Sequence, residues 1–177
     1  GGYRWQLTNG TYSYDAAVAR LSSNGVPDST FGIGGVASFD QNTTATVRGD
    51  QFIYAIDVDV AGQVVAVGYS RDYTAATNQY GNNSAVIARF TPNGQLDPTF
   101  NPSGGGVLRT TGAEGATSSQ KVAIDAEGKI LVGFSSALHR YNQDGSLDMS
   151  FNNTGTTLSS YSIQALTLDA FGRIVTA

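Results

Sequence analysis

Few residues in this chain have the chemistry of a catalyst. It contains one histidine, His139, and no cysteine, so a histidine-dependent triad would rest on His139 alone. A Gly-x-Ser-x-Gly motif is absent, and the glycine-rich runs at 32–35 and 104–106 do not stand between a strand and a helix, the context of a phosphate-binding loop. We therefore expect no catalytic residues and no cofactor.

Carboxylates offer a second kind of chemistry. Segment 142–148, Asn-Gln-Asp-Gly-Ser-Leu-Asp, is reminiscent of a calcium loop but lacks its leading aspartate and its distal bidentate glutamate. Asp57 and Asp59 fall on one face of an expected strand, yet nothing specifies the separation across a cleft that glycoside hydrolysis needs. We expect no metal site.

A third group of residues suits binding. The stretches 2–14 and 69–83 each combine aromatic side chains with an arginine and side-chain amides. Tyr, Trp and Arg are enriched at binding hot spots, and aromatic platforms beside amides suit sugars. Alternatively, these stretches extend neighbouring hairpins and their tyrosines pack on them. The candidate binding residues are Tyr3, Arg4, Trp5, Tyr69, Arg71, Asp72, Tyr73 and Tyr80.

Composition limits the class of partner. The net charge is −4 and the chain has only two lysines, Lys121 and Lys129, which argues against nucleic acid because phosphate binding needs clustered Lys and Arg. No apolar run approaches 18 residues, so we expect no membrane span. The absence of cysteine and a polar, acidic composition favour an extracellular or cell-surface location.

A pattern repeated three times must position these residues. Repeats of this kind indicate a solenoid, an array or a propeller. A side chain present in all three copies is expected to be structural, whereas one present once is free for function; His139 stands where the other copies have alanine, so we expect a hydrogen-bonded residue at the core edge. The first half of the pattern spans 16–31, 84–100 and 136–151, and the second half spans 54–68, 119–133 and 163–177.

Each second half predicts two strands. Apolar residues alternate with period two, as at Ile56 and Val58. An Asp-x-x-Gly stretch follows in every copy, beginning at Asp59, Asp125 and Asp169, and predicts a type I turn. The run after each turn is almost continuously apolar, which predicts a strand buried on both faces.

Each first half predicts a further hairpin around Asn-Gly or Asp-Gly. An arginine precedes the turn glycine by five residues and an aspartate follows it by three, so a hairpin would bring the two together. We interpret the aspartate as a turn cap and the phenylalanine three residues later as a plug between sheets. The structural repeat residues are Arg20, Asp28 and Phe31, Arg89, Asp97 and Phe100, and Arg140, Asp148 and Phe151.

Two hairpins per unit give an all-β fold, a β-propeller-like array of three four-stranded antiparallel blades that is cut within a blade. Segments 163–177 and 1–40 are expected to be halves of one blade, 52–106 the second and 119–155 the third, all within one segment, 1–177. The motif Ala-Arg-x4-Gly-x2-Asp-x2-Phe, followed by Asp-x-x-Gly and an apolar strand, resembles the bacterial delta-sixty repeat. That resemblance implies a propeller and an extracellular setting, and no agreed reaction.

The sequence also bears on assembly. Joined to Gly1, Ala177 would continue the motif in register, and three blades are fewer than the four to eight of closed propellers. We expect the missing strands to come from further blades of the same protein, from identical subunits in a ring, or from subunits in a fibre.

Two functions follow from these observations, and a third stays open. The first is a non-enzymatic scaffold for adhesion or self-assembly, completed by further blades or a partner subunit. The alternative is a carbohydrate- or peptide-binding module that uses the aromatic loops on the face where the variable connections emerge. An enzyme would need catalytic residues from outside this segment.

Overall fold

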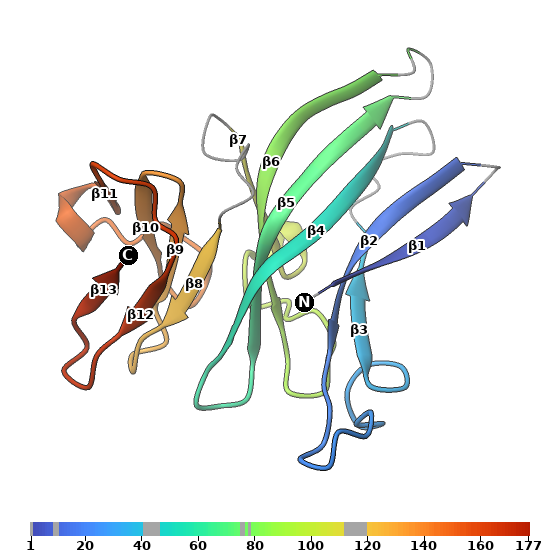
Figure 1. The fold of residues 1–177 in the computed structure, drawn as a ribbon, viewed down its shortest axis with the longest axis horizontal. Helices are drawn as coiled ribbons and strands as arrows, with labels where there is room; N and C mark the ends of the chain where they lie inside the picture. The colour runs from blue at the N-terminus through green and yellow to red at the C-terminus, as the bar shows by residue number, and fades with distance from the viewer. Residues whose placement is uncertain (1, 9–10, 41–46, 75–76, 78, 112–119) are drawn as a thin grey trace.

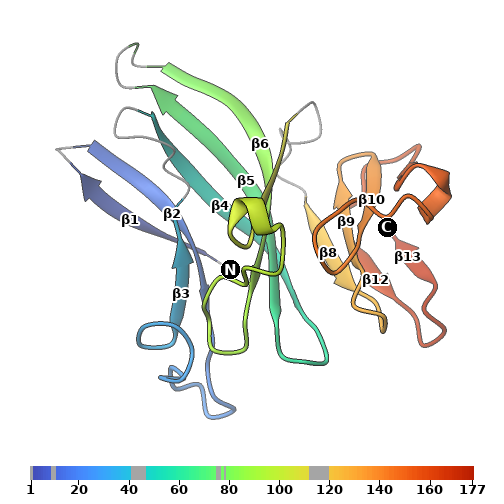
Figure 2. The ribbon, with the colours of Figure 1, turned by 180° about the vertical axis from the view of Figure 1, so that it is seen from behind.

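The chain folds into antiparallel sheets that stand side by side as propeller-type blades (Figure 1; Figure 2). We describe them in a computed structural model, in which strands predominate and short 3-10 helices, among them Pro102–Gly104 and Phe151–Asn153, interrupt the loops. The all-β, propeller-like class predicted from the repeats is confirmed. The structure describes residues 2–8, 11–40, 47–74, 77, 79–111 and 120–177, and of 2–8, 11–13, 47–48, 82 and 111 the backbone alone.

The second blade is the longest sheet, with the order β4-β5-β6-β7. Its central strand begins with the apolar run after the Asp-x-x-Gly turn, and these residues are buried on both faces as expected. Figure 1 shows β4, β5 and β6 rising well past the neighbouring third blade. The strands are β4 (Val47–Val58), β5 (Val64–Thr74), β6 (Gln79–Phe90) and β7 (Val107–Thr111).

The third blade repeats the same order, β11-β10-β9-β8, with shorter strands. A tight connection joins its two middle strands where the second blade has long arms. Its strands are β8 (Lys121–Ile124), β9 (Ile130–Phe134), β10 (Ala137–Tyr141) and β11 (Thr156–Leu158).

Two smaller sheets lie at the ends of the array. One is three-stranded, β1 (Gly2–Thr8), β2 (Thr11–Ala19) and β3 (Val36–Phe39), and the other is the hairpin of β12 (Leu166–Leu168) and β13 (Ile174–Thr176). Their registers nearly complement each other, but the join lies one residue later than the sequence predicts: Ala177 stands where the second blade has Val67, and Gly2, not Gly1, stands where it has Gly68. Gly2 pairs with Ala17 as Gly68 pairs with Val86 at the equivalent position of the second blade, so β13 corresponds to the first part of β5 and β1 to its later part.

The turns follow the sequence only in part. The Asp59 turn has the expected hydrogen bond, from the Gly62 N–H to the Asp59 carbonyl, and Gly62 has φ +81°. The Asn-Gly dipeptides, however, do not form two-residue hairpin turns. Gly25 donates to the Ser22 carbonyl, so Asn24 and Gly25 occupy the last two positions of a four-residue turn.

The fourth strand of each blade also differs from the prediction. After the arginine the chain makes only an isolated bridge across the turn, as between Leu21 and Pro27. The strand that completes the ladder comes after the phenylalanine, at β3, β7 and β11. The expected ranges 52–106 and 119–155 therefore leave out the fourth strands, because the Asp-x-Ser/Thr-Phe segment is a turn-rich connection and not a ladder strand.

The hydrophobic cores lie between the blades and not within them. The alternating faces of each central strand serve two cores, since Val64 and Ala66 pack toward the first sheet and Val65 and Val67 toward the third blade. A third, smaller cluster joins the third blade to the β12-β13 hairpin through Leu131, Leu138 and Ile163. Each blade is therefore stabilised by its neighbours.

Candidate functional site

The repeated polar residues form a closed network in each unit. In the second blade Arg89 Nε donates to Asp97 Oδ2 at 2.9 Å, and Arg89 Nη2 donates to Thr99 Oγ1 at 2.8 Å. The guanidinium lies over the Phe100 ring, 5.1 Å from its centroid. Burial opposes ionisation of Asp97, but hydrogen bonds from Thr99 and the charge of Arg89 give it a pKa below 3.8, its ordinary value.

The same network is present in the other two units. Arg20 and Arg140 each bond their aspartate at 2.8 Å and lie over the following phenylalanine. A third group adds to two of the three aspartates: Gln63 donates to Asp97 and Lys129 donates to Asp148. The chemistry of these residues is therefore used to hold each blade together.

The other predicted chemical groups also have structural partners. His139 lies buried in β10, with Nδ1 3.3 Å from Thr156 Oγ1 and its ring edge-on to Phe134. In segment 142–148, whose sequence partly resembles a calcium loop, Asp144 accepts hydrogen bonds from Ser146, and Asp148 binds Arg140 and Lys129. Within the described ranges, no three His, Cys, Asp or Glu residues are grouped to hold a metal.

Aromatic side chains gather on the long arms of the second blade. Phe52 of β4 stacks on Tyr69 of β5 at 5.0 Å between ring centroids, and Tyr54 also stacks on Tyr69, at 5.6 Å. Tyr14 of β2 contacts Phe52 at 5.6 Å, so the row crosses from one sheet to the next. The aromatic surface consists of Tyr14, Phe52, Tyr54, Tyr69, Tyr73 and Tyr80, with Arg71 among them.

An ion pair fixes the outer part of this surface. Arg71 Nη2 donates to Asp50 Oδ2 at 2.8 Å, and the guanidinium stacks 3.7 Å from the centroid of the Tyr80 ring. Asp50 also accepts the backbone N–H of Tyr14 at 3.3 Å, which ties β2 to β4. The hydrogen bond with Asp50 raises the pKa of Arg71 above its ordinary value, so the guanidinium is charged and locally neutralised.

The Tyr54 phenol is neutral. Burial, and after it the neighbouring Tyr69, raises the pKa of Tyr54 to about 12. The rings of Tyr14, Tyr54 and Tyr80 are nevertheless partly open to solvent. The surface therefore offers flat apolar rings with hydroxyl groups and no net charge.

Comparison with known families agrees with this architecture. Residues 8–31, 62–100 and 126–151 match the family described as "Domain of unknown function (DUF5122) beta-propeller", and together they make up about half of the chain. The chain belongs to this β-propeller family. No curated protein matches it.

The three matched segments of the DUF5122 family take in the repeated residues. All nine of the Arg, Asp and Phe positions named from the sequence fall inside them, at 20, 28 and 31, at 89, 97 and 100, and at 140, 148 and 151. Of the aromatic surface, Phe52 and Tyr54 fall outside the matched segments, whereas Tyr14, Tyr69, Arg71, Tyr73 and Tyr80 fall inside them. The match therefore includes most of the residues of the aromatic surface as well as the repeated structural residues.

The structure brings together only some of the predicted binding residues. Tyr69, Arg71 and Tyr73 alternate along β5 and share a surface with Tyr80 of β6. These residues belong to strands and not to a loop, so the described part of this stretch extends the hairpin of β5 and β6. Asp72 points to the opposite face and binds Arg109 at 2.9 Å. Tyr3, Arg4 and Trp5 lie in β1, and their side chains lie outside the described part.

Sequence reasoning missed three members of the surface and their anchor. Tyr54 is the extra residue at the irregularity in the β4-β5 register between Ile53 and Ala55, and Phe52 lies just before it, where a simple period-two pattern fails. Asp50 was missed because it precedes the recognisable repeat. Tyr14 could have been found, since it closes the aromatic stretch 2–14.

No helix in the described parts of the chain is long and apolar enough to cross a membrane.

Proposed function

We propose that this protein is a non-enzymatic β-propeller scaffold of the bacterial exterior or cell surface that adheres to carbohydrate through its aromatic surface. The repeated arginines and aspartates are engaged in structural networks, which leaves them poorly suited to chemistry on a substrate. The setting is supported by the cysteine-free composition and by the resemblance of the repeat to the delta-sixty repeat of secreted and surface proteins.

One observation carries this proposal, namely a row of stacked, partly exposed aromatic rings across β2, β4 and β5. Sugar rings present C–H faces that pack on aromatic faces, while phenol hydroxyls and a guanidinium donate hydrogen bonds to sugar hydroxyls. Rings placed in a row suit a chain of sugars better than a single one. Because Asp50 neutralises Arg71, a neutral polysaccharide fits better than an acidic one.

Polysaccharide binding by exposed-ring variants tests the proposal. Tyr54→Ala and Tyr80→Ala should each weaken binding to a panel of neutral polysaccharides by about tenfold or more, the loss typical of a hot-spot residue. Tyr161→Ala is the matched control, since Tyr161 and Tyr80 are 51% and 54% exposed and Tyr161 lies outside the surface. Calorimetric titration would give the affinities.

Three results would contradict this function. The wild-type chain would bind none of the polysaccharides, the two tyrosine variants would bind as the wild type does, or the surface would select extended peptides over sugars. The last result would keep the aromatic surface as a binding site but would replace the ligand class.

A further inference from the structure

Consecutive units in this chain are joined by a contact that occurs twice with the same geometry. In the first, Arg20 Nη1 donates to the carbonyl of Pro92, in the turn of the next unit, and the N–H of Gly32 donates to the Asn93 carbonyl at 2.8 Å. In the second, Arg89 Nη1 donates to the carbonyl of Gln143, and the N–H of Asn101 donates to the Asp144 carbonyl at 2.8 Å. We call this contact the turn latch.

The glycine of each turn lets that turn pack closely against the buried phenylalanine of the preceding unit. A Cβ built on Gly94 would lie 2.6 Å from the Gly32 nitrogen and 3.1 Å from the Phe31 ring. A Cβ on Gly145 would lie 3.0 Å from the Phe100 ring. Only glycine allows this approach, and both plugs are fully buried as a result.

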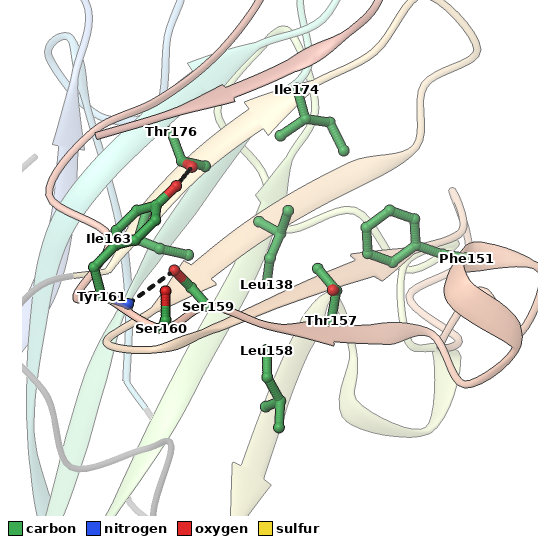
Figure 3. Close-up of a pocket in the computed structure, with 10 residues that line it drawn as sticks. All are labelled: Leu138, Phe151, Thr157, Leu158, Ser159, Ser160, Tyr161, Ile163, Ile174 and Thr176. Carbon is green, nitrogen blue, oxygen red and sulfur yellow. Dashed lines mark hydrogen bonds between the residues drawn. The ribbon is translucent and has the colours of Figure 1, made fainter.

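In each turn latch, the arginine and phenylalanine of one unit form the half that receives the turn of the next unit. The third unit has this receiving half, but no turn of the described residues packs against it. Arg140 bonds Asp148 and Ser150 and lies over Phe151, as its two counterparts do. Among the described residues, however, no turn carbonyl accepts from Arg140 Nη1, and Phe151 is only partly buried. A cavity of about 350 Å³ opens beside it, lined by Leu138, Phe151 and Thr157 among others (Figure 3).

The first unit carries the matching turn, also without a partner in the described part of the chain. The turn of Ser23, Asn24 and Gly25 is exposed, and a Cβ on Gly25 would meet nothing within 4 Å. Beside it, Leu21 is 58% exposed, whereas Phe90, its counterpart in the second unit, is fully buried.

Comparison of equivalent positions in the three units shows that the cavity of the third unit and the exposed strip of the first unit match each other. Leu138 pairs with Thr157 in register, at the positions that Val18 and Ala37 hold in the first sheet. Val18 and Ala37 are covered by Ala88, Phe90 and Val107 of the next blade, whose counterparts are Ala19, Leu21 and Val36. The cavity therefore has the position that the strip of Ala19, Leu21 and Val36 would fill.

A charged pair completes the match. Asp97 and Asp148 each bind the residue after the Asp-x-x-Gly turn of their own blade, Gln63 and Lys129. The corresponding residue for Asp28 is Arg173, whose side chain, within the described part of the chain, bonds Asp169 and lies over the Phe171 ring, both in its own turn. The Asp28 side chain is 29% exposed, against 5% for Asp97, so it has room for this third partner.

We propose that copies of this chain join head to tail, with the Arg140–Phe151 half of the turn latch on one copy receiving the Ser23-Asn24-Gly25 turn of the next. The strip beside that turn fills the cavity, and Arg173 of the first copy binds Asp28 of the second. Such a contact is heterologous, so it builds either a closed ring or an open chain. It uses none of the aromatic surface and stands apart from carbohydrate binding.

Sedimentation equilibrium of the 177-residue chain over a wide range of concentration tests this contact. We expect reversible association above the 18.5 kDa of one chain. Leu21→Glu should weaken it about a hundredfold, because association would bury an unpaired charge. Val60→Glu makes the same change at an exposed turn outside the contact and should leave association unchanged. Both residues are exposed, so both variants should keep the monomer's urea midpoint.

Mixing two variants distinguishes the proposed contact from non-specific association. Leu158→Glu places a charge at the rim of the cavity, at a residue that is largely exposed, and should also abolish association. A mixture of Leu21→Glu and Leu158→Glu chains retains one intact strip and one intact cavity, so association should return. A chain that stays monomeric, an effect of Val60→Glu equal to that of Leu21→Glu, or a mixture that does not associate would overturn the proposal. Polysaccharide binding measured on the same samples would report on the other function independently.

Discussion

Arg89 and Asp97 form an ion pair whose side chains are 7% and 5% exposed, whereas Arg20 and Asp28 form the same pair at 35% and 29%. The repeat therefore places one motif in two electrostatic surroundings. A buried charge that loses its partner is costly, while an exposed one is solvated by water. The same ion pair is therefore expected to contribute differently to the free energy of unfolding in the two units.

Arg89→Ala should accordingly lower the free energy of unfolding by about 3–5 kcal/mol, because Asp97 would remain buried without its cation. Arg20→Ala should cost clearly less, although it removes the same set of contacts by type. Urea unfolding followed by circular dichroism gives both values. Equal losses for the two variants would show that burial does not decide the energy of this motif.

At the scale of elements, the turn glycines form a natural pair for comparison. Gly25 and Gly94 have almost the same backbone, with φ +78° and +80°. A Cβ on Gly25 meets open space, whereas one on Gly94 would collide with Gly32 and the Phe31 ring. The backbone strain is shared, so any difference between them reports packing between blades.

Gly25→Ala should destabilise the monomer by about 1–2 kcal/mol, the cost of a left-handed alanine. Gly94→Ala should cost about 1–3 kcal/mol more, because the turn would be pushed away from the plug. Thermal or urea unfolding at low protein concentration checks this difference. If the two variants lose the same stability, packing of the Gly94 turn against Phe31 contributes little to the stability of the monomer.

Elements also show how far the sequence could predict the fold. The Asp-x-x-Gly turns and the buried strands after them follow from local chemistry, and the structure has them. The stretch 69–83 was expected to be a loop, because it is polar and rich in Asn, Gly and Tyr. Residues 69–74 and 79–83 are strand because pairing between β5 and β6, and packing of Arg71 on Tyr80, outweigh local preference. Contacts between distant strands, such as Tyr14 with Phe52, have no local signal.

At the scale of the whole molecule, the aspartates of the repeats give a shared response to pH. In each of them, hydrogen bonds to the carboxylate from Ser, Thr, Lys, Arg or backbone N–H groups favour the charged form. A pKa that is lower in the folded state means that the carboxylate adds stability above its ordinary pKa and loses it as the pH falls. The aspartates with a pKa below the ordinary 3.8 are Asp28, Asp97, Asp144, Asp148 and Asp169.

The free energy of unfolding should therefore be nearly level above about pH 5 and should fall steeply as the pH drops through and below the ordinary aspartate value. Asp97→Asn should lower the level part and also make the acid fall shallower, since one of the protons taken up on unfolding is removed. Urea titrations at a series of pH values measure both quantities. Because the blades hold one another through shared cores, the transition at each pH should be a single step. An Asp97→Asn chain with an unchanged acid slope would mean that its carboxylate contributes equally in the folded and unfolded states.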